Sequence, residues 1–238
     1  MQLFFCDWII VMSFLGNYFG VFFQKWAITL KQVRIRNQVL FTIFLYLFLF
    51  KYCRVIMTLL EVRQGTQLYD PLLAIIPPMD FSLITFSLTY IALLTFWLSN
   101  IIHPKTFIIG LQAYCILIIM RTITIYLVPL EPPLGMILLK DPVTIIFMST
   151  PNGGYIVKDL FFSGHVSAIS LFYFVTTNIK IKRILLFLCV SVGTLILIQH
   201  VHYTIDVLAA PFFAYFAYFL SAKLYSYLHE FDANAIAN

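Results

Sequence analysis

Long apolar runs, separated by short stretches that hold most charges and prolines, constrain this chain more than any other feature. Apolar residues make up 62% of its 238 residues, and charged residues only 11%. A soluble fold has no core large enough to hide that much apolar side chain. A helix needs about 20 apolar residues to cross roughly 30 Å of hydrocarbon. The sequence therefore predicts an integral membrane protein of the all-α class.

The runs predict a polytopic bundle of six core transmembrane helices. These helices are expected near residues 38–60, 81–102, 106–129, 163–179, 184–202 and 204–228. A further apolar run at 3–23 contains Asp7, Asn17 and scattered aromatic side chains. That mixture favours an N-terminal helix lying in the membrane interface, and a seventh span is the alternative.

Basic residues gather on one side of this six-helix arrangement. They are Lys25, Lys31, Arg34, Arg36, Lys105, Lys180, Lys182, Arg183 and Lys223. The positive-inside rule makes that side cytoplasmic and places the loops 61–80 and 130–162 outside. The second loop contains Pro129, Pro132, Pro133, Pro142, Pro151, Gly153 and Gly154 at its start or within it, and we expect it to fold over the mouth of the bundle.

This topology divides the chain into three parts. Residues 1–36 form the N-terminal hydrophobic helix with a basic cytoplasmic segment, 37–229 a six-helix catalytic domain, and 230–238 a cytoplasmic tail. The four cysteines lie within apolar runs without a Cys-x-x-Cys spacing, so neither a zinc site nor a disulfide framework is expected. No basic stretch belongs to a soluble fold, so we expect no nucleic-acid partner.

Ionisable residues stand at the ends of apolar runs in two short segments. One is Asp159-Leu160-Phe161-Phe162-Ser163-Gly164-His165, and the other is His202-Tyr203-Thr204-Ile205-Asp206. In the predicted topology both lie on the extracytoplasmic side. The sequence therefore favours a single site to which both segments contribute.

The Ser163-Gly164-His165 segment passes from a loop into a membrane helix. Free backbone amides and the positive end of the helix dipole favour an anion such as a phosphate at such a position. Glycine permits a close approach, the serine hydroxyl can donate to a phosphoryl oxygen, and the histidine can exchange a proton with an ester oxygen. The alternative is a helix cap followed by an interfacial histidine.

His202 and Asp206 are four residues apart, so on a helix they share one face. A carboxylate that holds one ring nitrogen of a histidine raises the basicity of the other nitrogen. His202 could then attack phosphorus and form a phosphohistidine. The alternative is a polar pair at a helix end, although ionisable groups at membrane depth are costly and usually functional.

Three further residues are candidates for the site. Arg121 lies within a predicted span, and we expect it to bind phosphate or an acidic partner; a structural pair with a carboxylate is the alternative. Asp159 could pair with Lys158, accept a hydrogen bond from the ammonium of a lipid donor, or fix His165. The sequence does not rank these roles. His200 is expected to point away from His202.

The motifs resemble a known family. Asp159-x-x-Phe162-Ser163-Gly164-His165 with His202-Tyr203-Thr204-x-Asp206-Val207 is similar to the sphingomyelin synthase branch of the lipid phosphate phosphatase (PAP2) superfamily. Two weaker matches are Pro77-Pro78-Met79-Asp80 and residues 121–126 running into the proline-rich 129–135. The animal enzymes show glycine at the position of Lys158 and some relatives carry a long cytosolic N-terminal extension. These differences imply a bacterial-type relative in the cytoplasmic membrane.

The resemblance implies transfer of a phospho-headgroup from a glycerophospholipid to ceramide or a related lipid alcohol, with release of diacylglycerol. His202 would be the nucleophile, Asp206 its orienting partner and His165 the proton-exchanging residue. We expect the substrate-binding residues to be Arg121, Lys158, Asp159, Ser163, Gly164 and Tyr203, without a metal ion or another cofactor. The alternatives are a PAP2-type lipid phosphate phosphatase and a non-catalytic lipid-binding or scrambling protein.

Overall fold

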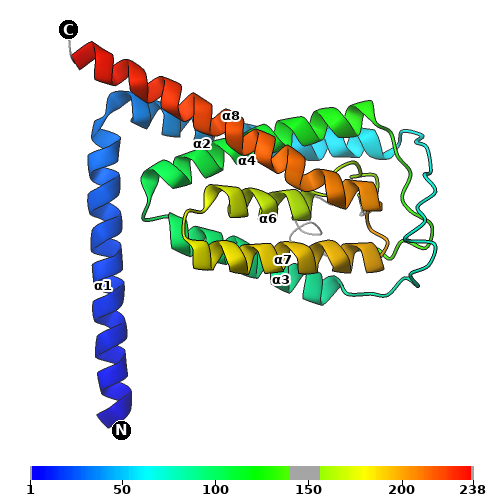
Figure 1. Cartoon of the computed structure of the whole chain (residues 1–238). Helices are drawn as coiled ribbons and strands as arrows, with labels where there is room; N and C mark the ends of the chain where they lie inside the picture. Colours follow the sequence, from blue (N-terminus) through cyan, green and yellow to red (C-terminus); the bar gives the residue numbers. More distant parts are fainter. Residues whose placement is uncertain (1, 140–155, 237–238) are drawn as a thin grey trace.

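The computed structural model describes residues 2–139 and 156–236, which form helices joined by loops (Figure 1). The helices are α1 (Gln2–Lys31), α2 (Val33–Glu61), α3 (Ser82–Asn100), α4 (Pro104–Leu127), α6 (Gly164–Val175), α7 (Ile179–Ile198) and α8 (Thr204–Ile236). The predicted all-α class is confirmed for the described residues.

Five of these helices are long and apolar enough to cross a membrane. They are α2, α3, α4, α7 and the part of α8 at Thr204–Leu228. Their outward faces expose large apolar side chains, among them Phe44, Leu83, Phe187 and Phe212. A surface of this kind is stable against lipid and not against water. The helices therefore indicate an integral membrane protein.

The predicted set of six core spans plus an N-terminal helix is wrong, because the fourth run forms a much shorter helix. In place of a span at 163–179, α6 has 12 residues and a length of about 18 Å. It begins at Gly164, directly after Ser163, whose side chain accepts a hydrogen bond from the Val166 amide. It ends before Asn178, whose side chain caps the start of α7. The predicted span of 163–179 included the polar residues Thr176, Thr177 and Asn178, which mark the break between α6 and α7.

The short helix α6 is the centre of the bundle, in contact with α3, α4, α7 and α8. Ile169 and Leu171 are fully buried. Gly193 of α7 permits α6 and α8 to approach α7 closely. A Cβ atom at Gly193 would lie 3.2 Å from Val207 of α8 and 3.6 Å from Val166 of α6. The starts of α6 and α8 are therefore held against the same point of α7.

The loops at one end of the bundle pack against each other. They join α2 to α3, α4 to α6, and α7 to α8, at the right of Figure 1. Thr66 forms a parallel β-bridge with Leu130, with hydrogen bonds from the Thr66 amide to the Pro129 carbonyl (2.9 Å) and from the Glu131 amide to the Thr66 carbonyl (3.0 Å). Pro142, Pro151, Gly153 and Gly154, which the sequence placed in this cover, lie outside the described residues.

Helix α1 runs across the other end of the bundle and not alongside the spanning helices (Figure 1). Tyr18 donates a hydrogen bond to the Leu98 carbonyl (2.6 Å) and Trp26 to the Ile101 carbonyl (2.7 Å), both at the C-terminal end of α3. This end also holds the basic residues of the α3–α4 and α6–α7 connections. The crosswise course favours an interfacial helix over a seventh span.

We expect α1 to lie at one depth in the bilayer. Single spin labels are placed at Asn17, Phe19, Phe23 and Gln24 in reconstituted protein, and their collision rates with oxygen and with a water-soluble nickel reagent are measured. We expect these rates to alternate with the helical period and to show no overall trend along the helix. Labels along the lipid-facing side of α7 provide the control, since their depth should change steadily. A steady change along α1 would contradict the interfacial placement.

Candidate active site

A backbone hydrogen bond joins the two polar segments that the sequence singled out. The Ser163 amide, directly before α6, donates to the carbonyl oxygen of Asp206 in the first turn of α8 (3.0 Å). The expected meeting of the two segments is therefore observed at the backbone level. The junction lies at the loop-covered end of the bundle (Figure 1).

His202 and Asp206 form a buried pair. His202 Nδ1 lies 3.2 Å from Asp206 Oδ2, and the two residues are 4% and 0% exposed. The prediction that both occupy one face of a helix is wrong, because α8 begins only at Thr204. Asp206 instead reaches back from the first helical turn, where the same oxygen accepts a hydrogen bond from the Tyr203 amide (3.1 Å). This is the geometry of the acidic residue in a capping box.

This geometry gives the two ring nitrogens of His202 different roles. A carboxylate beside Nδ1 favours the tautomer that carries its proton there, which leaves the lone pair on Nε2. Within residues 2–139 and 156–236, Nε2 has no hydrogen-bond partner. No group of three or more His, Cys, Asp or Glu side chains within these residues could hold a metal ion. The pair is thus arranged for nucleophilic or basic chemistry at Nε2.

Arg121 reaches from α4 to the segment before α6. Its guanidinium forms an ion pair with Asp159 (2.7 Å) and donates to the carbonyls of Asp159 (3.0 Å) and Phe162. Burial raises the pKa of Asp159, but the Arg121 charge, aided by His202 and His165, outweighs this and holds the pKa below its ordinary value. Phosphate binding and a structural pair with a carboxylate were the two roles considered for Arg121, and the structure contains the pair. Asp159 pairs with Arg121 and not with Lys158.

Gly164 lies directly against this arginine. A Cβ atom at Gly164 would come within 3.0 Å of Arg121 Cζ and 3.3 Å of its Nε and Nη1 atoms. The first residue of α6 thus has a guanidinium beside its backbone, where the sequence predicted phosphate binding. Ser163 is fully buried and its hydroxyl caps the helix at Val166. The ring of His165 packs edge-on against Phe86, with ring centres 5.7 Å apart.

Lys158 and Tyr203 form hydrogen bonds with the loops at this end of the bundle. Lys158 pairs with Glu131 (2.7 Å) and also donates to the Arg63 carbonyl (2.6 Å). The Tyr203 hydroxyl donates to the Glu131 carbonyl (2.8 Å) and accepts from the Leu68 amide (3.1 Å). Both residues, expected to bind substrate, therefore connect the α4–α6 and α7–α8 junctions to the first loop.

The contacts of several residues in this network were not predicted from the sequence. Glu131 accepts from Lys158 and from the Gly65 amide, and Asp70 accepts from Thr204 at the start of α8. His200, expected to point elsewhere, has one ring nitrogen 2.8 Å from the Leu134 carbonyl and the other 2.9 Å from the Ile76 carbonyl. No spacing rule identifies such contacts, because Asp70 and Thr204 are 134 residues apart.

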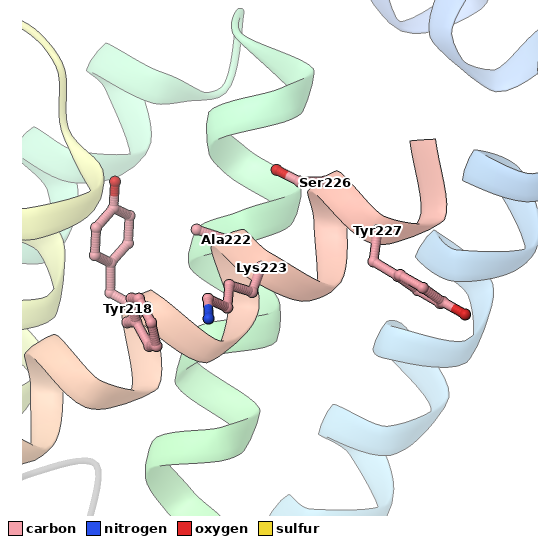
Figure 2. A pocket seen from close by; sticks show the side chains of 6 residues that line it. Tyr218, Ala222, Lys223, Ser226 and Tyr227 are labelled. Carbon is pink, nitrogen blue, oxygen red and sulfur yellow. The ribbon is translucent and has the colours of Figure 1, made fainter. Parts of the chain in front are cut away.

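A surface groove lies on α8 far from these residues. Figure 2 shows it, lined by Tyr218, Phe219, Ala222, Lys223, Ser226 and Tyr227. Lys223 is 19 positions beyond Thr204, which corresponds to about 28 Å along a helix. The lining has no histidine or carboxylate, and Lys223 lies over the Phe219 ring at 4.6 Å. The groove does not offer the acid–base groups found at the junction of α6 and α8.

One known protein family matches a part of this chain. A family model described as "PAP2 superfamily C-terminal" matches residues 158–223, just over a quarter of the chain. The matched stretch contains His165, His202 and Asp206. No curated protein matches the chain in a sequence search. Residues 158–223 are thus similar to the C-terminal region of a superfamily of membrane phosphatases and phosphotransferases, without an indication of the branch.

The loop cover should loosen in acid. Burial raises the pKa of Asp70, but the hydrogen bonds from Thr204, Leu73 and Leu72 together outweigh this and lower the pKa. The Lys158 hydrogen bond lowers the pKa of Glu131. Carboxyl groups whose pKa falls on folding stabilise the fold fully above the unfolded value, about 4 to 4.5, and lose this effect as the pH drops through the folded value.

Hydrogen exchange, corrected for the intrinsic pH dependence, measures this loosening. Amides in 62–81 and 128–139 should be protected near neutral pH and lose protection below about pH 4, while α6 stays protected. The Glu131→Gln variant should already show weaker loop protection at neutral pH. Equal loop protection at neutral and acid pH would rule out the carboxylates as the source of order.

Proposed function

We propose that the protein is a membrane phosphotransferase that moves a phospho-headgroup from a glycerophospholipid to ceramide or a related lipid alcohol. The observation that carries the proposal is the His202–Asp206 pair, buried and with Nε2 of His202 left for a substrate. The similarity of residues 158–223 to the PAP2 superfamily supports phosphate-ester chemistry. The choice of ceramide is based on the resemblance of the sequence motifs.

In the first half-reaction, Nε2 of His202 attacks the phosphorus of the donor lipid. A P–N bond forms and the bond between phosphorus and the diacylglycerol oxygen breaks. His165 gives a proton to that oxygen, which leaves as the hydroxyl of diacylglycerol. Asp206 stabilises the positive charge that develops on the His202 ring, because its carboxylate is only 3.2 Å from Nδ1.

In the second half-reaction, the hydroxyl of the acceptor lipid attacks the phosphorus of the phosphohistidine. The acceptor loses its proton to His165, a P–O bond forms, and the P–N bond breaks to restore neutral His202. A phosphatase would use water in place of the lipid alcohol. Exclusion of water by the packed loops favours the alcohol, since both nucleophiles would compete for the same intermediate.

The charges at the site support a phosphodiester donor over a phosphomonoester. Asp159 neutralises Arg121 at 2.7 Å, and Asp206 offsets any positive charge on His202 at 3.2 Å. Lys158 is likewise paired with Glu131. A phosphodiester carries one negative charge, whereas a monoester such as phosphatidic acid carries up to two. Because carboxylates already match Arg121, Lys158 and any charge on His202, the site favours the ester with the smaller negative charge.

The proposed site faces the extracytoplasmic side of a bacterial cytoplasmic membrane. Lys105, Lys180, Lys182 and Arg183 belong to connections at the end opposite the site, as do the basic residues that link α1 and α2. The positive-inside rule then orients that end towards the cytoplasm.

Transfer is tested with purified protein in vesicles that contain labelled ceramide and either phosphatidylethanolamine or phosphatidylcholine. We expect a phosphorylated ceramide product and an equal amount of diacylglycerol. His202→Ala should lower the rate on the order of 10⁴-fold, because no nucleophile remains. Phosphate release from phosphatidic acid without any lipid transfer would establish the phosphatase alternative. Lipid binding or scrambling that is unchanged in His202→Ala would support the non-catalytic alternative.

Gly164→Ala should lower the transfer rate about 10- to 100-fold, because the added methyl group displaces the Arg121 guanidinium from the start of α6. The matched control is Gly20→Ala, where a Cβ atom on α1 has no other atom within 4 Å. Both rates are measured in the same vesicles. An equal rate for Gly164→Ala and Gly20→Ala would show that the contact with Arg121 does not influence the reaction.

A further inference from the structure

Asp206 caps only the Tyr203 amide at the start of helix α8, and the amide of Thr204 has its partner outside the helix. Its first residue is Thr204, and the preceding Tyr203 accepts the first helical hydrogen bonds at its carbonyl, from the Asp206 and Val207 amides. A capping side chain is normally a short serine, threonine, aspartate or asparagine at this position. Tyrosine cannot fold back onto the first-turn amides, and its hydroxyl is bound to Leu68 and Glu131.

Asp70 of the first loop is that partner. Its Oδ2 accepts from the Thr204 amide (2.7 Å) and its Oδ1 from the Thr204 hydroxyl (3.0 Å). The same carboxylate is fixed within its own loop, because Oδ1 also accepts from the amides of Leu72 (3.0 Å) and Leu73 (3.3 Å). A negative charge at this place also interacts favourably with the helix dipole.

The cap is directly connected to the reactive pair. In the sequence, Thr204 lies midway between His202 and Asp206. The Oδ2 atom of Asp206 accepts a hydrogen bond from the Tyr203 amide (3.1 Å) and lies 3.2 Å from Nδ1 of the His202 ring. A rotation of the first turn of α8 would change the place of Asp206 relative to the ring. Leu73, two positions beyond the Asp70–Pro71 turn, packs with Leu160 and Tyr203 and so presses the loop against this turn.

We infer that Asp70 is a positioning residue, which caps α8 from the first loop and thereby fixes the orientation in which Asp206 holds the His202 ring. This inference rests on the proposed function for its kinetic consequence. Asp70 itself does not touch the reacting atoms. Its removal should therefore lower the rate of the chemical step and leave substrate binding largely unchanged.

The kinetic test compares Asp70→Ala with the unmodified protein in vesicles of the same lipid composition. We expect kcat for lipid transfer to fall about 10- to 100-fold, because a small misplacement of a catalytic group has effects of this size, while KM stays within about twofold. A raised KM with unchanged kcat would overturn the inference in favour of a binding role. Unchanged kcat and KM would overturn it altogether.

Milder variants separate positioning from folding. Thr204→Ser keeps both hydrogen bonds to Asp70 and should retain nearly the normal kcat. Thr204→Val loses the hydroxyl bond (3.0 Å) and keeps the amide bond, and Asp70→Asn keeps one acceptor oxygen; both should give an intermediate kcat. Should Asp70→Ala fail to fold, these variants carry the test. Equal kcat for Thr204→Ser and Thr204→Val, together with a normal Asp70→Asn, would contradict the inference.

Asn178→Ala is the matched control for the loss of a cap. The Asn178 side chain accepts from the amides of Lys180 (2.9 Å) and Ile181 (3.4 Å) at the start of α7, at the end of the bundle away from the site. It should lower thermal stability as a lost cap does and leave kcat unchanged. A loss of kcat equal to that of Asp70→Ala would mean that any lost cap slows the reaction.

A spectroscopic measurement makes the inference independent of turnover. In protein labelled with ¹⁵N at histidine, the Nδ1 proton of His202 should give a downfield signal because it is bonded to Asp206. This signal should vanish or shift in Asp70→Ala and persist in Asn178→Ala. If the unmodified protein transfers no lipid, the proposed function fails while this comparison still decides the role of Asp70. An unaltered His202 signal in Asp70→Ala would overturn that role.

Discussion

The hydrogen bond from the Ser163 amide to the Asp206 carbonyl is the contact on which the rest of the site depends. It joins the start of α6 to the start of α8 and places the Ser163-Gly164-His165 segment beside the His202–Asp206 pair. Backbone groups within a membrane bundle must find partners inside the protein, because lipid offers none. This bond satisfies two such groups where two helices begin, and it needs no particular side chain.

Carboxylates at this end of the bundle each have a distinct partner. Asp159 binds Arg121, Glu131 binds Lys158, Asp206 binds His202, and Asp70 binds the start of α8. These contacts join different loops and helices, so the pairing of charges also orders the loops. The imidazole of His202 thus lies at an end of the bundle where Arg121 and Lys158 are each paired with a carboxylate.

Sequence patterns predicted the features that depend on a single helix or a single short segment. Apolar runs located α3 and α4 to within about two residues and α2 and α7 to within about five, whereas α8 ends eight residues beyond the predicted end. The contact between His202 and Asp206 was expected, although the two residues do not share a helix face. The predicted length of α6 was wrong, because the span at 163–179 included the polar residues Thr176, Thr177 and Asn178, where α6 has ended and α7 is capped. The caps and clamps from Asp70, Glu131 and Arg121 join distant segments, and neither hydropathy nor spacing contains that information. Tertiary packing alone determines them.

The close approach of Gly193 to Val166 and Val207 also fixes how deep the site lies. Gly193 comes five positions before the end of α7, about 7 Å along the helix axis. The first turns of α6 and α8 therefore lie below the level at which α7 ends. Under the proposed function, the phosphate of the donor lipid must reach the level of these first turns, below the end of α7. Access to that depth would then contribute to selectivity, together with the chemistry of the headgroup.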